Sequence, residues 1–447
     1  MTDRRARRLP AHRGPAAWSE ILGPQDPLQT LESDETADFA IVGAGFAGLA
    51  AARRLLQIEP RARIVVLEAG RIAEGASGRN SGFMIDLPHD LSSEDYAGKG
   101  VEADRALIAL NRQAIAFAED AVEEYGIDRN FFDKAGKVNA AASAPAHRRN
   151  LAYAGHLDRL AEPSEMLDDR QMREWTGSSH YLSGLYTPGT VMLQPAGYVR
   201  ALAKGLRQSV RILENSPVRE LERSGNCWRV KTPRGTVSAG RIILANNGHL
   251  ESFGYARRRL MHLFLYASMT PELDSRALGM LGGRPRWGIT PSDPMGTSMR
   301  RIDTTQGGNR ILTRTCATVR PGMAASARDV ERAARVHRRK FEQRFPQLEG
   351  LRQEYSWAGQ LCLTLNAVAV MGEVDENVFA ACVQNGLGTV RGTLTGIGAA
   401  EFACGVASGI TRHFTAEHPP RRLPPEPFAA IGANAWIRYR EWRAKDE

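Results

Sequence analysis

The chain has 447 residues, of which 43% are hydrophobic and 24% charged, and it carries a formal net charge of +9. This length allows two or three domains with a large core, and the composition is ordinary for a soluble globular enzyme. No run approaches the ~18 uninterrupted apolar residues of a membrane helix. No apolar segment follows the basic N-terminus, as it would in an export signal. We therefore expect a cytoplasmic protein without a membrane span.

The five cysteines are odd in number, scattered along the chain, and form no C-x-x-C pair. This pattern predicts neither a disulfide framework nor a zinc site, and we expect buried thiols in a reducing compartment. Asp86 and His89 lie close together in sequence, but no third ligand follows at a recognised spacing. We expect no metal centre.

Positive charge is concentrated in two segments. Residues 1–14 contain five arginines and one aspartate, and the segment 328–340 carries arginines at helical spacing, Arg332, Arg335, Arg338 and Arg339. Such segments can contact nucleic acid or acidic lipid. Because no aromatic residues interleave with the arginines and no nucleic-acid motif is present, we favour a solvated helix face and expect no nucleic-acid partner. The basic charge could draw anionic substrates toward a cleft.

A glycine-rich motif near the N-terminus organises the chain. An apolar run at 38–42 ends in the pattern G-x-G-x-x-G, an alanine-rich helix pattern follows, and a second apolar strand at 63–67 leads into Glu68. The glycines permit a tight turn, close approach to a pyrophosphate and close helix packing. Glu68 could accept hydrogen bonds from both ribose hydroxyls, and it would repel a 2′-phosphate, which argues against NADP. We predict a dinucleotide site that includes Gly43, Gly45, Phe46, Ala47, Gly48, Glu68 and Ala69.

The loop at 71–82 follows this motif directly and consists of small and polar residues. It offers backbone donors, a hydroxyl, a guanidinium and an amide, which could hold a pyrophosphate and the edge of a second ring system. An ordinary solvent loop of the same composition is the alternative. The predicted contacts in this loop are Arg71, Gly75, Ala76, Ser77, Arg79, Asn80 and Ser81.

The N-terminal third contains an arm and a helical insertion. Residues 1–36 are rich in Pro, Arg and Gly, and we expect an extended, partly disordered arm that packs a segment containing Trp18 on the body. Helical periodicity at 100–126, 147–160 and 168–175 predicts an insertion beside the dinucleotide unit.

The rest of the chain returns to strands. Short strands are predicted across 210–239, and a buried strand at 240–248 ends in small residues beside the cofactor. Alternating strands at 260–317 predict an antiparallel sheet, and a basic helix follows at 325–344. A glycine-rich turn then leads into a long helix at 394–412, which offers a second helix N-terminus for negative charge.

These motifs, in this order, resemble the D-amino acid oxidase family of flavoproteins, closest to its γ-glutamylputrescine oxidase and glycine and sarcosine oxidase branch. The resemblance spans about residues 37 to 415, and its most specific part is the Gly-Ala-Ser-Gly-Arg-Asn loop. The segments that carry it are 43–48, 68–71, 75–80, 194–198, 217–218, 245–248, 357–359 and 385–388.

The resemblance implies an α/β fold, α+β overall, in which a glutathione-reductase-like FAD-binding Rossmann domain is joined to a mostly antiparallel substrate domain. The expected FAD-binding ranges are 37–99, 185–258 and 350–420. The helical insertion and the substrate domain take 100–184 and 259–349, and a tail takes 421–447.

By resemblance the cofactor is FAD, not NAD. Val218 would contact adenine through its backbone, and the turn at 386–393 would lie near the flavin carbonyl edge. Gly359 stands where sarcosine oxidases carry the cysteine bonded to flavin, so we expect non-covalent FAD. Leu387 replaces a histidine common between the glycines of this turn in relatives. The remaining cofactor positions implied are Ala245, Asn246, Gly248, Gly386, Gly388, Thr389, Gly392 and Thr393.

The family chemistry needs the protein mainly to position the substrate carbon, keep the amine neutral and stabilise the flavin anion. We therefore look for positioning groups rather than a nucleophile. The catalytic candidates are His89, His262 and Trp357. The substrate-binding candidates are Met84, Arg300 and Arg391.

Each candidate has a structural alternative. Either histidine could be an ordinary buried or hydrogen-bonded side chain, and Trp357 could be plain core. Arg300 and Arg301 are adjacent on a predicted strand and point to opposite faces, so at most one could clamp a substrate carboxylate. Arg391 could serve the flavin or the substrate.

The leading hypothesis is an FAD-dependent oxidase of a small-molecule amine or amino acid, which transfers hydride to flavin N5, hydrolyses the imine and reduces O2 to hydrogen peroxide. The alternative is a dehydrogenase that passes electrons to a quinone or a carrier protein. A third hypothesis is a flavin-like fold used only for binding. The oligomeric state stays open at this point.

Overall fold

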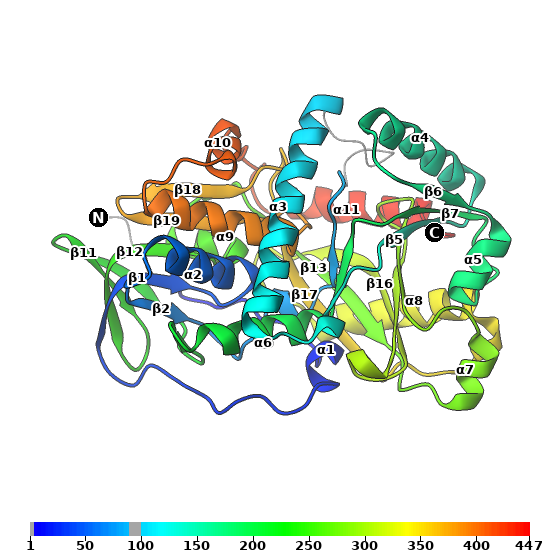
Figure 1. The fold of residues 1–447 in the computed structure, drawn as a ribbon, viewed down its shortest axis with the longest axis horizontal. Helices are drawn as coiled ribbons and strands as arrows, with labels where there is room; N and C mark the ends of the chain where they lie inside the picture. The colour runs from blue at the N-terminus through cyan, green and yellow to red at the C-terminus, as the bar shows by residue number, and fades with distance from the viewer. Residues whose placement is uncertain (1–3, 89–99) are drawn as a thin grey trace.

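The computed structural model describes residues 4–88 and 100–447 and places two large sheets side by side (Figure 1). The first has the strand order β10-β11-β12-β1-β2-β9, with β19 paired to β12 and β18 to β19. Its centre is parallel, because β1 pairs in parallel with both β2 and β12. These strands are β1 (Glu35–Val42), β2 (Ile64–Leu67), β9 (Arg211–Leu213), β10 (Glu220–Ser224), β11 (Cys227–Lys231), β12 (Thr236–Leu244), β18 (Val370–Asp375) and β19 (Val378–Cys382).

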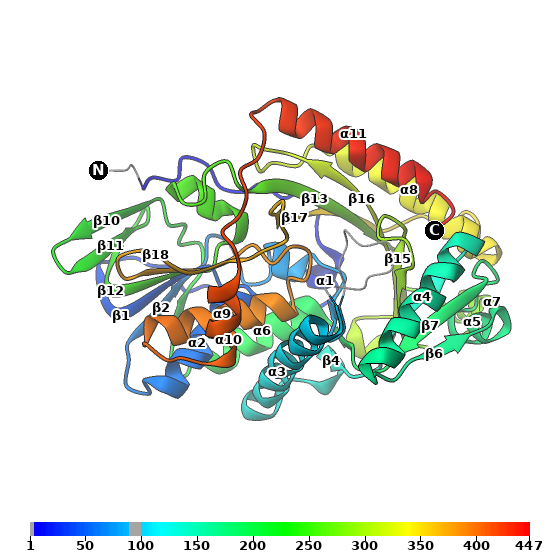
Figure 2. The ribbon, with the colours of Figure 1, turned by 90° about the horizontal axis from the view of Figure 1, so that it is seen from above.

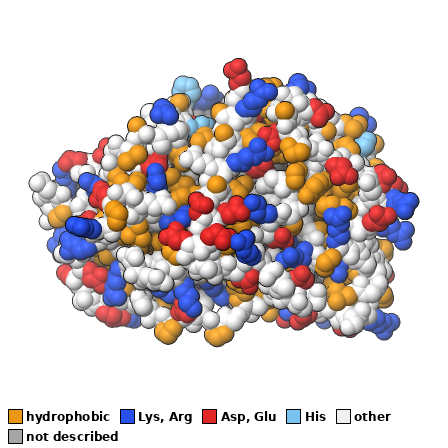
Figure 3. Space-filling view, viewed as in Figure 1, with side chains coloured by type: hydrophobic (Ala, Val, Ile, Leu, Met, Phe, Trp, Pro, Cys, Tyr) orange, Lys and Arg blue, Asp and Glu red, His pale blue; other side chains and the backbone are white. Residues whose placement is uncertain are grey.

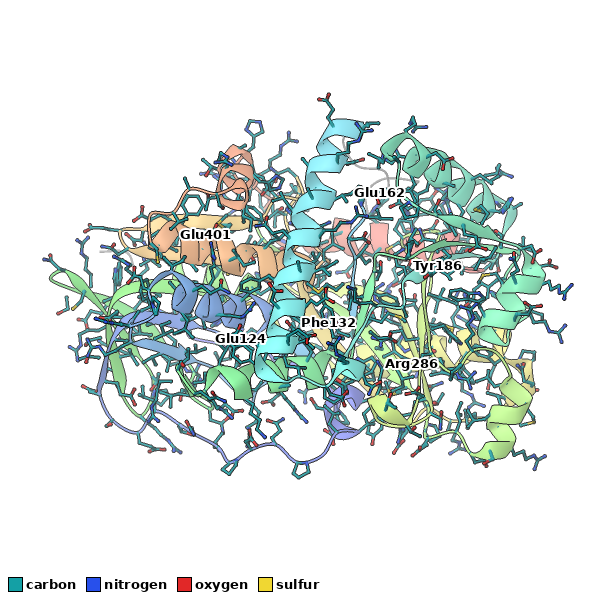
Figure 4. The ribbon with its side chains drawn as sticks, viewed as in Figure 1. Glu124, Phe132, Glu162, Tyr186, Arg286 and Glu401 are labelled. Carbon is teal, nitrogen blue, oxygen red and sulfur yellow. The ribbon has the colours of Figure 1, made fainter. Side chains whose placement is uncertain are left out.

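Two helices, α2 (Phe46–Ile58) and α9 (Val390–Ala403), cover one face of this sheet, and α3 (Val101–Tyr125) packs on α9. α2 and α9 pack so closely that a Cβ at Gly396 would lie 2.2 Å from the Ala47 carbonyl oxygen. Arg53 on α2 pairs with Glu124 of α3, and the next residue, Arg54, pairs with Glu401 of α9. Figure 4 shows the two glutamates on their separate helices.

The second sheet has the order β17-β13-β16-β15-β14-β5-β7-β6. Its pairs are antiparallel except β14 with β5. Helices α8 (Ala327–Arg344) and α11 (Phe428–Arg443) lie together on its outer face (Figure 2). The strands are β5 (Lys137–Ala141), β6 (Glu165–Leu167), β7 (Ser183–Thr187), β13 (Met261–Met269), β14 (Trp287–Pro291), β15 (Ser298–Ile302), β16 (Arg310–Val319) and β17 (Tyr355–Leu363).

A three-stranded sheet, β3-β8-β4, lies beside both. It consists of β3 (Phe83–Met84), β8 (Val191–Leu193) and β4 (Phe132–Asp133). The remaining helices are α1 (Ala17–Glu20), α4 (Ala144–Leu160), α5 (Asp169–Thr176), α6 (Pro195–Leu206), α7 (Ser275–Leu281) and α10 (Gly409–Ala416).

The structure differs from the sequence predictions in several places. β7 and β17 belong to the second sheet, although most of β7 and all of β17 fall in ranges predicted for the cofactor domain. The single helix predicted at 394–412 is two helices, since α9 ends at Ala403 and Gly405 takes a φ of +70°. The tail predicted at 421–447 contains the 16-residue helix α11.

Two searches bear on membrane and metal binding. None of the helices in the described ranges is long and apolar enough to cross a bilayer. Within those same ranges, no cluster of three His, Cys, Asp or Glu side chains is arranged to hold a metal ion.

Candidate functional site

A cavity of about 630 Å³ lies between the two large sheets. One half of its wall comes from the ends of β1, β2 and β12 and the loops that follow them, together with the start of α2 and the turn before α9. The other half comes from strands β13 to β17 and from the N-terminal arm. The volume lies in the range of cofactor and ligand sites.

The turn between β1 and α2 forms one wall. Gly43 has a φ of +105°, and a Cβ there would lie 2.7 Å from the Ala245 carbonyl oxygen, so only glycine fits. A Cβ at Gly48 would lie 1.8 Å from the Gly43 carbonyl oxygen. Among the described residues no side chain caps α2, and its first two residues line the cavity. Its first N–H groups are therefore available to an anion.

Glu68 follows β2 at the same edge of the sheet. Its Oε2 accepts from the Ala44 N–H at 2.8 Å, and its Oε1 accepts from the Gly70 N–H at 3.2 Å. Burial raises the pKa of this carboxyl, and the backbone N–H groups oppose that shift. The backbone thus holds the carboxylate at the cavity wall, where its other lone pairs suit a pair of ribose hydroxyls.

Two indole rings hold the loop at 75–82. Trp18 Nε1 donates to the Asn80 carbonyl oxygen at 2.8 Å, and Trp357 Nε1 donates to the Arg79 carbonyl oxygen at 3.0 Å. The Arg79 guanidinium donates to several backbone carbonyl oxygens, 2.6 to 3.5 Å away. The guanidinium that we predicted to line the pyrophosphate is therefore engaged by the chain itself.

A second helix start meets the cavity beside the start of α2, since a Cβ at Gly392 would lie 3.2 Å from the Phe46 side chain. Leu387, Gly388 and Thr389 line the cavity just before α9, and Thr389 Oγ1 donates to the Phe83 carbonyl oxygen at 2.7 Å. In the described part of the chain no side chain caps α9. The free N–H groups and the positive end of its dipole can stabilise a negative charge.

Most residues predicted to contact the cofactor line this cavity. They are Gly43, Gly45, Phe46, Ala47, Glu68, Ala69, Gly75, Ala76, Ser77, Arg79, Asn80, Ser81, Val218, Ala245, Asn246, Gly386, Gly388, Thr389 and Gly392.

Four predicted cofactor residues lie behind the wall. Gly48 packs under the glycine turn, and a Cβ at Gly248 would meet the side chains of His262 and Cys362. Arg71 pairs with Glu214 at 3.0 Å. Thr393 Oγ1 donates to the backbone of its own helix. These residues support the wall rather than form it.

Two of the three predicted catalytic residues, His262 and Trp357, do not line the cavity formed by the described residues. His89 lies outside the described residues. His262 is 3% exposed, and its Nε2 lies 2.8 Å from Glu251 Oε2. Trp357 is fully buried and holds the cofactor loop, and Met84 is buried in β3. His262 and Trp357 thus have the buried, hydrogen-bonded setting that the structural alternative describes.

The predicted substrate arginines are also structural. Arg300 is 1% exposed, its Nη1 donates to the Ser81 carbonyl oxygen at 3.1 Å, and its guanidinium lies 5.1 Å from the Trp18 ring centre. Burial lowers its pKa to about 9. The neighbouring Arg301 donates to a backbone carbonyl on the opposite face. Arg391 pairs with Glu417 at 3.1 Å. None of the three lines the cavity formed by the described residues.

Other residues line the half of the cavity that is formed by the second sheet and the arm. Those that sequence reasoning missed include His12, Tyr266, Thr290, Ser298, Arg314 and Gln360. The register of β13 against β16 shifts between Leu265 and Tyr266, and Cys316 opposite has a φ of +67°. The extra residue of this β-bulge is on β16, and on β13 three successive residues, 265 to 267, line the cavity. Simple alternation along the sequence could not have identified them.

The N-terminal arm is part of this wall, which differs from the partly disordered arm that we predicted. Ala11 exchanges backbone hydrogen bonds with Met323 and Ala325, and the Ala358 N–H donates to the Arg13 carbonyl oxygen at 2.8 Å. His12 Nδ1 is buried and has no hydrogen-bond partner among residues 4–88 and 100–447. Burial, with a smaller effect of Arg79, lowers the His12 pKa to about 3, so its ring is neutral.

The parallel sheet, the glycine turn, the acid after β2 and the two helix N-termini define a dinucleotide-binding protein whose site is closed by a second sheet. The chain matches the DAO family, described as FAD dependent oxidoreductase, over residues 38–402, and it belongs to that family. The predicted family, its mixed α/β fold and its FAD dependence are thereby confirmed.

Two relatives match over most of their length. γ-Glutamylputrescine oxidoreductase of Escherichia coli is 26% identical over 427 residues, covering 91% of this chain and 93% of the relative. A probable oxidoreductase, OrdL, of Haemophilus influenzae is 25% identical over 386 residues, covering 84% of each chain. Among solved structures, glycine oxidase from Geobacillus kaustophilus superposes with a TM-score of 0.68 at 19% identity, covering 84% of this chain and 96% of that one.

The residues present fit FAD. The cavity has backbone N–H donors at two helix starts for phosphate and flavin charge, and a backbone-held carboxylate for the ribose. Gln360 Nε2, in the far wall, is buried without a hydrogen-bond partner in the described ranges, as expected of a wall built to meet a ligand.

Proposed function

We propose that this chain oxidises the C–N bond of a small amine or amino acid, with non-covalent FAD as its cofactor and O2 as its electron acceptor. The observation that carries the proposal is the continuity of one cavity, which joins the dinucleotide wall to polar side chains of the second sheet. The names of the relatives, a γ-glutamylputrescine oxidoreductase and a glycine oxidase, support an amine or amino-acid substrate.

When bound, FAD would supply the acceptor for the hydride on the carbon next to the nitrogen, and its reoxidation by O2 would give hydrogen peroxide. The chain's own residues bind and orient. Glu68 would hold the ribose hydroxyls, the start of α2 would hold the pyrophosphate, and the start of α9 would stabilise negative charge on the ring. No nucleophile or general-base pair is needed for this work.

In the half of the cavity formed by strands β13 to β17 and the arm, we assign substrate orientation to Arg314, Gln360 and His12. A guanidinium suits a carboxylate or another anionic group of the substrate. The unpartnered Gln360 Nε2 can donate to the substrate, and the neutral His12 ring can accept from an amine N–H without repelling it. The apolar neighbours Leu265, Ala267 and Leu387 exclude water from the amine.

All five cysteines are free thiols, which supports the expected cytoplasmic compartment.

An anaerobic titration of the purified holoenzyme tests the proposal. A panel of amines and amino acids, with and without a carboxylate, is added while flavin absorbance is followed. We expect bleaching by some members of the panel, and peroxide equal to the reduced flavin once air is admitted. Bleaching followed by slow reoxidation in air would instead identify the dehydrogenase alternative. No bleaching by any amine would contradict the proposal.

A further inference from the structure

The C-terminal helix α11 presents its apolar side to solvent. Large hydrophobic side chains along it are exposed by 47 to 72%: Phe428, Ile431, Trp436, Tyr439 and Trp442. Their spacing of three to five residues places them on one stripe, along with Gly432, Ala435 and Arg443, which are also exposed. The three aromatic rings at its C-terminal end form a row, with centroids 5.7 and 6.2 Å apart.

The polar side of the same helix faces the protein and fixes its orientation. Asn434 Oδ1 accepts from the Val319 N–H at 3.0 Å, and Glu441 Oε1 accepts from the Ala317 N–H at 2.9 Å, so both satisfy backbone donors of β16. Ile437 is buried against the same sheet. Because these bonds would be lost on rotation, α11 cannot turn its aromatic stripe inward.

Positive charge borders the stripe. α8 lies beside α11 on the same outer face of the second sheet (Figure 2), and Arg332 of α8 pairs with Glu441 of α11. The face of the molecule shown in Figure 3 carries interspersed positive and negative side chains. On α8, in contrast, four arginines are exposed. In the described ranges Arg338 alone of these four pairs with an acid of the same helix, Glu342, so positive charge is in excess there. The exposed arginines are Arg328, Arg335, Arg338 and Arg339.

We propose that the aromatic stripe of α11 and the arginines of α8 dock this protein on the surface of an anionic lipid bilayer. Trp and Tyr rings prefer the level of the lipid headgroups, where an apolar ring and a polar edge are both accommodated. Arginines that flank such a stripe add electrostatic attraction to the phosphates of anionic lipids. The helix lies in the plane of the interface rather than across it.

A second copy of the chain fits this surface less well. A two-fold interface would place the same basic border on both partners, and the like charges would oppose burial of the aromatic stripe. A lipid surface supplies the opposite charge instead.

Co-sedimentation of the full chain with vesicles tests the docking. We expect binding to vesicles of phosphatidylcholine with phosphatidylglycerol, weaker binding to phosphatidylcholine alone, and loss of binding as salt is raised. The double variant Trp436→Ser, Trp442→Ser should reduce the bound fraction at least tenfold. Arg335→Glu combined with Arg339→Glu should abolish the preference for anionic lipid. Leu28→Ser, 43% exposed in the part of the arm where Asp26 pairs with Lys204 of α6, is the matched control and should bind like the parent.

Unchanged flavin content and melting temperature would show that these surface variants remain folded. Equal sedimentation with and without anionic vesicles would overturn the proposal. So would a dimer in solution that dissociates in the double variant, since a second copy would then cover the stripe.

Discussion

The two halves of the cavity are built from different parts of the chain. The cofactor half is mainly backbone: glycine turns, helix starts and a carboxylate held by N–H groups, much of it from the continuous stretch 42–83. The other half consists of side chains from strands β13 to β17 and from the arm, residues as far apart as His12 and Gln360. Backbone groups suffice to hold phosphate and ribose, whereas a particular substrate needs particular side chains.

This contrast predicts different outcomes for substitutions. A change in the cofactor half should remove the flavin or the fold. A change in the other half should leave the flavin in place and alter the choice of substrate.

The largest effect is expected at Gly48. In Gly48→Val the new Cβ would lie 1.8 Å from the Gly43 carbonyl oxygen, so the turn between β1 and α2 cannot form. We expect purified protein with no bound flavin, measured as flavin absorbance per chain. Gly240→Ala on β12 is the control, because its nearest neighbour would be 3.5 Å away and the variant should stay yellow. A yellow Gly48→Val protein would contradict the assignment of this turn.

The next test separates two arginines. Arg314→Ala should raise KM for anionic substrates about 10- to 100-fold, the loss expected for a charged hydrogen bond, with flavin content unchanged. Arg300→Ala should instead lower stability by roughly 3 kcal/mol and release flavin, because Arg300 holds the Ser81 carbonyl oxygen and stacks on Trp18. Steady-state kinetics and thermal unfolding measure the two effects. If both variants lost flavin equally, Arg314 would belong to the cofactor half.

A smaller effect is expected for Glu68→Gln. The amide keeps the shape of the side chain but turns one acceptor into a donor that faces the N–H of Ala44 or Gly70. We expect FAD to dissociate about tenfold more readily, measured by quenching of flavin fluorescence in apoprotein titrations. KM for the amine should stay within twofold. A large change in KM with normal FAD affinity would place Glu68 in the wrong half.

The smallest effect concerns pH. Burial lowers the pKa of Lys137 to about 7, and its Nζ donates to Thr290 Oγ1 at 3.1 Å behind the second half of the wall. Between pH 7 and about 10.5 the unfolded chain binds a proton that the folded chain lacks, so this lysine makes stability rise with pH across that window. The melting temperature of Lys137→Met should therefore exceed that of the parent at pH 6, and the difference should be smaller at pH 9.

Lys134→Met is the matched control for the pH test, because Lys134 is an exposed surface lysine paired with Glu119. Its melting temperature should follow the parent at both pH values. An equal shift of Lys137→Met at pH 6 and pH 9 would mean that Lys137 keeps an ordinary pKa.

The sequence by itself determined the cofactor half. The glycines, Glu68 and the small residues at 75–82 act through local backbone geometry, and nearly all of them line the cavity. Local geometry depends on neighbours a few residues away, so spacing along the chain is enough to identify it.

The tertiary structure alone decided which residues line the other half of the cavity, formed by strands β13 to β17 and the arm. Arg300 looked suited to a substrate, yet packing turned it toward Trp18, while Arg314 and Ser298, adjacent in register, reached the cavity. Backbone pairing with residues 323 to 325 and 358 drew the arm against the wall. These outcomes depend on which distant strands pair and in which register, and that information is not contained in any short stretch of sequence.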